Sequence, residues 1–266
     1  IGPQRVRQVA AEGRDQGGAT LYDAMYRRFQ EVGGKVKGVL WYQGESDSTD
    51  EAAPEYFRKF SEFIEAVRRD FEQPELPFYY VQIGRLTVTD NPLLKNWNRI
   101  QMDQLRLESA LPNVGMVATV DLSMDDLIHI GTPGLKVVGH RLANRVLTDV
   151  YKIRNDDVGP RPVKAVRGTT KFGNVVKVIY EVGNGGLSSE GRLAGFSISD
   201  GQGNPLALIY NQTIDPSGEA VLLWVQGEVP EDAQLSYGRG GDPYCNLGDG
   251  AGSGAPVFGP VPIEKE

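Results

Sequence analysis

Cysteine is almost absent from the 266 residues, since Cys245 is the only one. A single cysteine excludes an internal disulfide and a Cys-x-x-Cys metal site, and it leaves the redox compartment open. No apolar run approaches the roughly 18 to 20 residues that a membrane helix requires. The first residues, IGPQRVRQVA, lack the apolar region of a signal peptide. The sequence therefore predicts a globular chain without a membrane span.

Clustered positive charge is also lacking. The chain has 28 Lys and Arg against 35 Asp and Glu, so its formal net charge is -7 and its pI is near 5.1. Nucleic-acid binding requires Lys and Arg gathered in one place, and the sequence contains no dense basic run. A nucleic-acid partner is therefore not expected, and an uncharged or weakly charged substrate fits better.

Helical periodicity alternates with short apolar runs from residue 20 to about 152. The expected helices are 21–32, 55–71, 96–111 and 132–152, and the expected strands are 36–43, 77–84 and 113–122. In the last helix, Thr132 is expected as the N-cap and Pro133 as the first helical residue. Its apolar face is expected to carry Leu135, Val138, Leu142 and Val146. This alternation indicates βαβ units, so we predict an α/β domain with a doubly wound parallel sheet in residues 1–158.

The pattern changes to short β-rich runs after residue 158. They cover 175–182, 193–200, 206–211 and 220–226, and they are separated by Gly, Asn, Asp and Pro. No long helical pattern interrupts them, which predicts an all-β C-terminal domain at 159–266 with two packed antiparallel sheets. The Gly-rich tail GDGAGSGAPVFGP, at 248–260, is expected to be loop.

Polar residues directly follow the predicted strands of the first domain. In a parallel, doubly wound sheet, ligands gather at the carboxyl ends of the strands. We therefore expect Gln43, Glu45, Asp121 and the loop 125–129 to converge at one edge of the sheet.

The sharpest constellation is DDLIHIGTPG, in which Asp126 precedes His129 by three residues. One short turn with this spacing holds a carboxylate against the imidazole Nδ1, which fixes the tautomer and leaves Nε2 free to take a proton from a nucleophile. A surface histidine beside acidic residues is the alternative that the spacing leaves open. The second histidine, His140, falls within the last helix, largely off its apolar face, and is expected to be solvated.

Gln43 places an amide donor at the end of a buried strand, where it is suited to bind a developing oxyanion. The alternative is an amide that only satisfies backbone groups of the loop. For Glu45 three roles stay open: a second acid for the imidazole, a substrate ligand, or an acceptor that organises the loop, which we favour. Trp41 and Tyr42 are expected to be core and cleft wall.

Asp121, Asp125, Asp126 and His129 also suggest a metal site, because carboxylate and imidazole groups ligate metal ions. However, three carboxylates within six residues are common in loops. Chemistry without a metal or a cofactor is therefore the preferred interpretation.

WYQGESD and DLIHIGTPGLKVVGHRLA together resemble two blocks of the sialate O-acetylesterase and acetylxylan esterase branch of the SGNH hydrolase superfamily. Weaker matches lie in family order: GGATLYDAM, LPFYYVQIG and NRIQMDQLRLESALPNVGMVATVDL. LAGFSISDGQGNPLA and LSYGRGGDPYCNLG resemble the β-rich C-terminal part of the sialate O-acetylesterases. The resemblance covers nearly the whole chain. It implies a flavodoxin-like SGNH fold followed by a sandwich-like β domain.

Carried over by matching position, the resemblance implies a role for each site residue. His129 is the general base, Asp126 is its orienting acid and Gln43 is an oxyanion donor. Glu45 occupies an acidic position whose role, catalytic or structural, stays open. The resemblance implies neither a metal nor a cofactor.

What the chain lacks is the nucleophilic serine block of this family, a GQSN-like segment after the first strand. Nothing before Gly38 matches it, and GQGN at 201–204 has glycine in place of the serine. Because the chain opens on Ile1, we expect a processed or truncated product. The nucleophile and an inner strand of the sheet are then expected on an N-terminal segment or a second chain. Ser46 and Ser48 are the in-chain alternatives.

The expected function is a serine esterase that removes O-acetyl groups from a carbohydrate. Its expected partners are the acetylated carbohydrate and the segment that carries the serine. A non-catalytic carbohydrate-binding protein on a decayed hydrolase scaffold and a metal-assisted hydrolase are the rival functions. The identity of the sugar, the compartment and the oligomeric state stay open.

Overall fold

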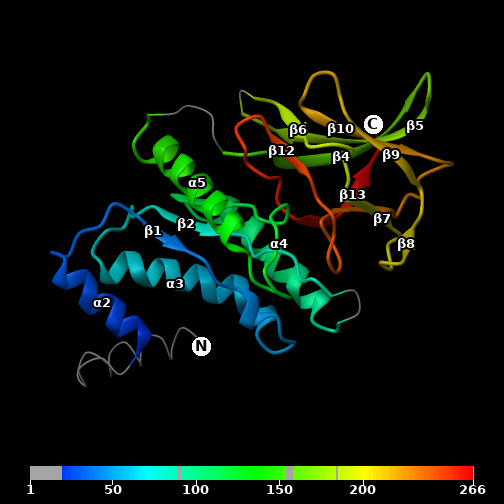
Figure 1. Ribbon diagram of the computed structural model, residues 1–266. Coiled ribbons are helices and arrows are strands. Elements are labelled where there is room, and N and C mark those ends of the chain that lie inside the picture. Colours follow the sequence, from blue (N-terminus) through cyan, green and yellow to red (C-terminus); the bar gives the residue numbers. More distant parts are fainter. Residues whose placement is uncertain (1–19, 89–90, 154–157, 184, 266) are drawn as a thin grey trace.

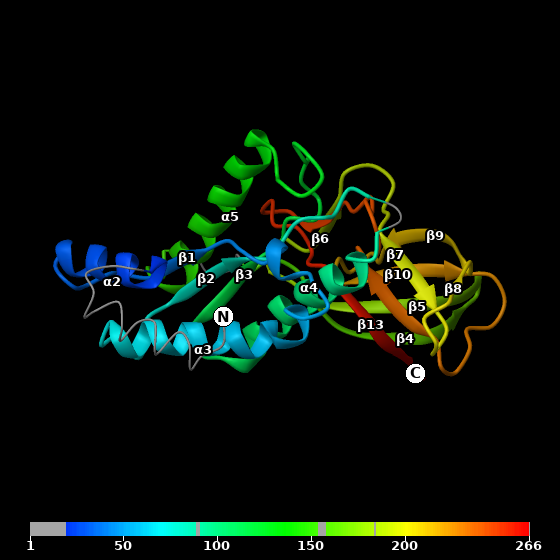
Figure 2. The same cartoon turned by 90° about the horizontal axis from the view of Figure 1, so that it is seen from below.

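The computed structural model describes residues 20–88, 91–153, 158–183 and 185–265. These residues form two parts that lie side by side (Figures 1 and 2). The α/β part runs from Leu21 to Asp149, and the β part runs from Arg161 to Glu264. An α/β part followed by an all-β part is thus confirmed, and the domain limit at residue 158 stays a prediction.

Three short parallel strands form the sheet of the α/β part: β1 (Val39–Trp41), β2 (Phe78–Val81) and β3 (Val114–Val117). Their order is β1-β2-β3, so β2 is central, and among the described residues β1 pairs with β2 alone. Leu40 on this edge strand is 59% exposed. The third strand is shorter than predicted, because a turn closed by the hydrogen bond from the Leu122 N–H to the Thr119 carbonyl follows it.

Helices cover both faces of this sheet (Figure 1). The helices of the described α/β part are α2 (Leu21–Glu31), η1 (Glu45–Asp47), η2 (Ala53–Glu55), α3 (Tyr56–Asp70), α4 (Leu94–Ala110) and α5 (Thr132–Asp149). Because successive side chains of a strand point to opposite faces, Phe78 packs against α3 and α4 while Tyr79 packs against α5. Phe29 of α2 stacks on Phe71, which follows α3. No helix in the described ranges combines the length and the apolar character needed to cross a bilayer.

The start of α5 differs by one residue from the prediction. Gly131, not Thr132, is the N-cap, and its extended backbone has φ -65° and ψ 161°. Thr132 is the first helical residue, and Pro133 lies in the first turn. Proline is tolerated there because its missing N–H has no partner within the helix at that point.

The buried face of α5 also differs from the prediction. Leu135 is exposed, whereas Arg141 and Arg145 are buried. These arginines form ion pairs with Asp121 and Glu108, respectively. Apolar periodicity alone does not predict which side of α5 is buried, because the long side chains of Arg141 and Arg145 form part of the buried side.

The β part contains one large sheet and one small one. Its strands are β4 (Arg161–Thr170), β5 (Gly173–Glu181), β6 (Leu187–Ser189), β7 (Phe196–Ser199), β8 (Pro205–Leu206), β9 (Ile209–Ile214), β10 (Ala220–Val225), β11 (Gln234–Tyr237), β12 (Leu247–Asp249) and β13 (Phe258–Glu264). Eight of them form a mixed sheet in the order β8-β7-β11-β13-β4-β5-β10-β9, which curls into a half-barrel (Figure 2), and β12 pairs with β6. The prediction of two packed antiparallel sheets is therefore wrong.

The C-terminal strand β13 explains this error. It lies between β11 and β4, antiparallel to the first and parallel to the second, and so joins strands that would otherwise form separate sheets. It begins at Phe258, inside the tail that we predicted to be loop. Pro260 and Pro262 hide it in the sequence, because proline has no N–H to donate and is rare inside sheets.

Gln82 joins the two parts. It follows β2 directly and is fully buried. Its Nε2 donates to the carbonyls of Val257 (3.0 Å) and Gln101 (2.9 Å), and its Oε1 accepts the N–H of Val257 (2.8 Å). A side-chain amide carries the same donor and acceptor as a peptide group, so it bonds the Val257 backbone as a neighbouring strand would. The β part is thereby fixed at the carboxyl end of β2.

Replacing this amide tests its role. Gln82→Leu leaves the buried N–H and carbonyl of Val257 without partners, and each unsatisfied group costs about 1–3 kcal/mol. We expect the free energy of unfolding, measured by urea denaturation, to fall by roughly 2–5 kcal/mol. The matched control is Gln226→Leu, an exposed glutamine that bonds the Ala207 carbonyl. Its effect should stay within about 0.5 kcal/mol. Equal losses in the two variants would contradict the role of Gln82.

Candidate active site

The loop after β1 contains a glycine whose place is fixed by packing. Gly44 has a φ of 156°, and a Cβ there would lie 2.9 Å from Ile83 Cγ2. The carbonyl of Gln43 accepts hydrogen bonds from the Tyr56 hydroxyl (3.1 Å) and from Gln104 Nε2 (3.1 Å). The backbone of the Gln-Gly pair is therefore held against α3 and α4, at the edge of the sheet where the sequence predicted it.

The side chain of Gln43 is held as well. Its Nε2 donates to Asp47 Oδ2 at 2.5 Å. This partner is a carboxylate of η1 and not a backbone group of the loop. The bond uses one of the two amide hydrogens, so the second remains available for a ligand oxygen.

The turn from Asp126 to His129 contains the hydrogen bond that its spacing predicts. His129 Nδ1 and Asp126 Oδ2 are 2.8 Å apart. The other carboxylate oxygen, Oδ1, accepts the backbone N–H groups of Ile128 (2.9 Å) and His129 (2.8 Å). The turn also docks on Thr87, whose N–H donates to the Leu127 carbonyl at 2.9 Å. Asp126 thus fixes both the turn and the imidazole ring, and Nε2 is the ring nitrogen left for another partner.

The pKa values of this pair are shifted in opposite directions. The N–H of Ile128, followed by the hydrogen bond from the His129 ring, lowers the pKa of Asp126 to about 2. The hydrogen bond to Asp126, followed by its charge, raises the pKa of His129 above its ordinary value. The side chains of His129 and Asp126 are 67% and 56% exposed, so solvent screens their attraction. The pair therefore sets the tautomer and proton affinity of the ring more than it stabilises the fold.

Glu45, in the loop after β1, acts on this turn through its charge. Its charge adds to the rise in the pKa of His129. Burial, followed by the charge of Glu45 and a hydrogen bond with it, raises the pKa of Tyr42 above its ordinary value. These effects on the two pKa values fit two roles for Glu45: a second acid beside the imidazole, or an acceptor that organises the loop.

Asp121 does not join this group, which corrects the expected convergence. Its Oδ1 lies 2.8 Å from Nη1 of Arg141, and its Oδ2 lies 2.5 Å from Nη2. The metal site suggested by the sequence would need Asp121 beside Asp125, Asp126 and His129. In the part of the chain that the structure describes, no group of three or more His, Cys, Asp or Glu side chains is arranged to hold a metal ion.

The in-chain nucleophile candidates differ in their surroundings. Ser48 is buried, and its hydroxyl donates to the Glu45 carbonyl at 2.8 Å. The single cysteine of the chain is not a further candidate. Burial raises the pKa of the Cys245 thiol to about 12, so little thiolate forms. Ser46 is exposed and remains the in-chain alternative.

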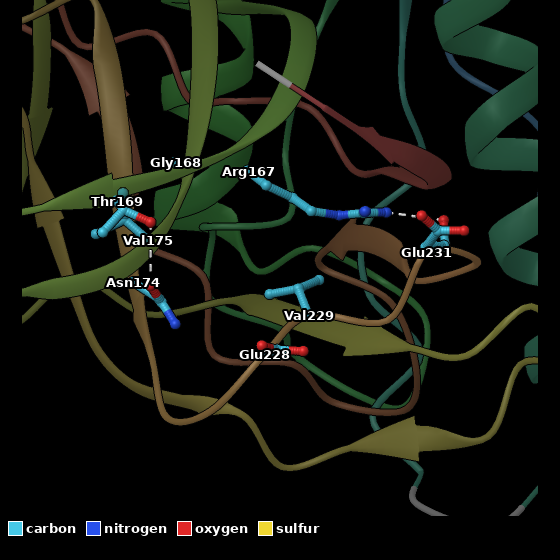
Figure 3. A pocket seen from close by; sticks show the side chains of 8 residues that line it. All are labelled: Arg167, Gly168, Thr169, Asn174, Val175, Glu228, Val229 and Glu231. Carbon is cyan, nitrogen blue, oxygen red and sulfur yellow. Dashed lines mark hydrogen bonds between the residues drawn. The ribbon is translucent and has the colours of Figure 1, made fainter.

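A cavity of about 550 Å³ lies outside this site (Figure 3). All of its lining residues belong to the β part. Its polar groups bond one another: Thr169 Oγ1 lies 3.1 Å from Asn174 Oδ1, and Arg167 Nη2 donates to the Glu231 carbonyl at 2.8 Å. Because none of its lining residues belongs to the loop after β1 or to the turn before α5, we assign the cavity no role in the candidate site.

Two contributors to the site were not predicted. Asp47 holds the Gln43 amide, and the charge of Glu45 contributes to the raised pKa of Tyr42, although the sequence marked Tyr42 only as a cleft wall. The signal for Asp47 is its position four residues after Gln43, which one turn of 3-10 helix brings back towards that side chain. The partners of Tyr42 depend on the path of the loop, and no spacing rule gives that path.

Known proteins are similar to this chain in sequence or in structure. Residues 8–148 match the family described as carbohydrate esterase, sialic acid-specific acetylesterase. A carbohydrate acetylesterase of Xanthomonas citri has a similar structure, with a TM-score of 0.70 and 25% identity, and the likeness covers 84% of this chain and 50% of that one. A probable carbohydrate esterase of Arabidopsis thaliana is 41% identical over 71 residues, which are 25% of this chain and 27% of that protein.

The matched regions thus cover about half of the Xanthomonas chain and about a quarter of the Arabidopsis protein. The region matched to the family contains both the loop after β1 and the turn before α5. The candidate site therefore lies within the family match.

An NMR pH titration of the His129 ring tests the geometry of the turn. We expect a midpoint above about 6.5 in the native chain, and a lower midpoint in Asp126→Asn, which removes the charge and keeps the side-chain size. As pH falls through the raised pKa, Nε2 becomes protonated and can no longer act as a base. His140→Gln assigns the two imidazole signals. An unchanged His129 midpoint in Asp126→Asn would show that the carboxylate does not control the ring.

Proposed function

The chain belongs to the sialic acid-specific acetylesterase family of carbohydrate esterases, and from this premise we propose that it supplies the base half of a serine esterase for acetylated carbohydrates. In this proposal His129 is the general base, Asp126 orients it and Gln43 donates to the oxyanion. The observation that carries the proposal is the 2.8 Å contact between Asp126 Oδ2 and His129 Nδ1. With Nδ1 donating to the carboxylate, Nε2 of the neutral ring is the proton acceptor.

The proposed reaction has two stages. A serine hydroxyl at His129 Nε2 gives its proton to that nitrogen while its oxygen attacks the acetyl carbonyl carbon. The carbonyl oxygen becomes an oxyanion, which the second amide hydrogen of Gln43 stabilises. The imidazolium then protonates the departing sugar oxygen, which leaves the acetyl group on the serine. In the second stage, water gives a proton to the same nitrogen as its oxygen attacks the acetyl carbon. The imidazolium then returns that proton to the serine oxygen as the acetyl–serine bond breaks, and the acetyl group leaves as acetic acid.

We propose that the serine belongs to an upstream segment or a second chain, outside the described residues. Three observations support this assignment. The edge strand β1 pairs on one side alone among the described residues. Leu40 on that strand is 59% exposed, and the His129 side chain is 67% exposed. A strand added at this edge would use the free backbone groups of β1 and cover Leu40.

The proposed substrate class follows from the family and from the charge of the chain. The relatives of Xanthomonas citri and Arabidopsis thaliana are described as a carbohydrate acetylesterase and a probable carbohydrate esterase. A net charge of -7 suits a substrate without phosphate groups. An O-acetylated sugar meets both conditions.

Complementation tests the proposed origin of the nucleophile. We expect the 266-residue chain alone to hydrolyse 4-nitrophenyl acetate no faster than its His129→Ala variant, because no activated serine is present. Supplying the upstream segment, as a fusion or a separate fragment, is expected to restore turnover. Changing its candidate serine to Ala, or His129 to Ala, should abolish that turnover.

Two outcomes would redirect the proposal. Hydrolysis by the intact lone chain that disappears in Ser46→Ala would place the nucleophile in the loop after β1. Sugar binding without any hydrolysis by the complemented protein would favour the non-catalytic carbohydrate-binding alternative.

Gln43→Ala tests the oxyanion role in the complemented enzyme. An oxyanion donor acts mainly in the transition state, so we expect kcat to fall about 100-fold or more, with a smaller change in KM. Gln226→Ala is the matched control and should leave both constants unchanged. A rise in KM alone would make Gln43 a substrate-binding residue.

A further inference from the structure

A cavity of about 310 Å³, which we call the junction cavity, lies between the two parts of the molecule. Asp121 and Arg141 line it from the α/β part. Its other lining residues come from the β part, from 188–190 and 244–254. Ligand sites often lie where two parts of a protein meet, and this volume is at the lower end of the usual range of about 300–1,000 Å³.

Tyr244 is an exposed aromatic residue on the wall of this cavity. It is 68% exposed, whereas the adjacent Cys245 is buried. The chain around it is anchored on both sides: the Asp242 N–H donates to the Leu86 carbonyl (2.8 Å), and Asn246 Nδ2 donates to the Glu190 carbonyl (2.7 Å). A ring on an anchored loop presents a flat apolar face at low entropic cost, which suits stacking against a ligand.

Arg141 offers a buried donor to the same cavity. It is 7% exposed, and its bonds to Gly252, Ala118 and both oxygens of Asp121 use four N–H groups. A guanidinium has five N–H groups. Among the described residues, the fifth, on Nη2, has no hydrogen-bond acceptor. A ligand hydroxyl in the junction cavity can accept this hydrogen.

The charges of the cavity favour a neutral ligand. Asp121, Glu190 and Asp249 are its carboxylates, and Arg141 is the single cation among its described lining residues. Arg141 is already paired with Asp121. The carboxylate of Glu190 opposes an anionic ligand, and its oxygens can accept hydrogen bonds from hydroxyl groups.

The junction cavity is also connected to the candidate active site. The segment from Asp121 to His129 begins at the cavity wall and ends in the turn that holds the imidazole. Leu86 bonds the loop of Tyr244 through its carbonyl, and the next residue, Thr87, bonds the turn at Leu127. A chain of linked sugars bound in the cavity can therefore extend towards the turn.

We propose that the junction cavity is a subsite for a neutral sugar unit of an oligosaccharide, with Tyr244 stacking on the sugar ring and Arg141 donating to one of its hydroxyls. This inference rests on the proposed function in one respect: the bound unit is a neighbour of the acetylated one. Binding itself does not depend on the nucleophile.

Binding of neutral tetrasaccharides to the 266-residue chain tests the proposal. Xylotetraose and cellotetraose are the probes, and saturation-transfer NMR and calorimetric titration are the measurements. We expect one or both to bind, and Tyr244→Ala to weaken binding about 10-fold or more, which corresponds to about 1.4 kcal/mol. Tyr244→Trp should retain binding because it keeps an aromatic face. Tyr210→Ala, a change at an exposed tyrosine of β9, is the matched control and should have no effect.

An anionic oligosaccharide is the control for the negative charge of the cavity. Tetragalacturonic acid has the same length but carries carboxylates, and we expect it not to bind. In the complemented enzyme, Tyr244→Ala should raise KM for an acetylated oligosaccharide and leave turnover of 4-nitrophenyl acetate unchanged.

Two results would overturn the subsite: neither neutral probe binds, or Tyr244→Ala binds as well as Tyr210→Ala does. Hydrolysis of 4-nitrophenyl acetate without tetrasaccharide binding would remove the subsite and leave the proposed esterase function standing. Tetrasaccharide binding by the complemented protein without hydrolysis of 4-nitrophenyl acetate would remove the esterase function and leave the subsite standing.

Discussion

The amide of Gln82 lies between two backbones that are far apart in the sequence, and the arrangement of the molecule depends on this contact. This side-chain amide is fully buried, and it bonds the N–H and the carbonyl of Val257 and the carbonyl of Gln101. The backbone carbonyl of Gln82 accepts the Thr119 hydroxyl at 2.7 Å. An unsatisfied group here would be costly, so the β part has one defined position over the carboxyl end of the sheet. That position places the loop of Tyr244 beside the segment that leads to His129.

Charges serve different purposes at the junction and at the candidate site. At the junction, Arg161 lies 2.6 Å from Glu108, and Arg141 pairs with Asp121; these groups are shielded from solvent and stay paired. Removing one partner of such a pair would leave a buried charge. The Asp126–His129 pair is exposed, so it adds little to stability. Its effect is chemical, since it holds Nδ1 on Asp126 and leaves Nε2 of the ring for another partner.

The sequence predicted those features that depend on local rules. Alternating periodicity indicated the helices and the parallel strands, and three-residue spacing indicated the Asp126–His129 bond. Long-range pairing was not accessible: β13 inserts between strands distant in the chain, and its prolines hide it. The same limit applies to Asp121, which follows a strand as expected but turns to Arg141. The junction cavity also needs residues from both parts, and no short motif contains them.

The central claim is that His129 activates a serine that is not among these 266 residues. Labelling with a fluorophosphonate, which reacts with an activated serine and leaves a stable adduct, tests it directly when the labelled residue is identified by mass spectrometry. The account predicts no adduct on the lone chain. In the complemented protein it predicts one adduct, on the serine of the upstream segment, which is lost in His129→Ala. An adduct on Ser46 of the lone chain, lost in His129→Ala, would contradict the account.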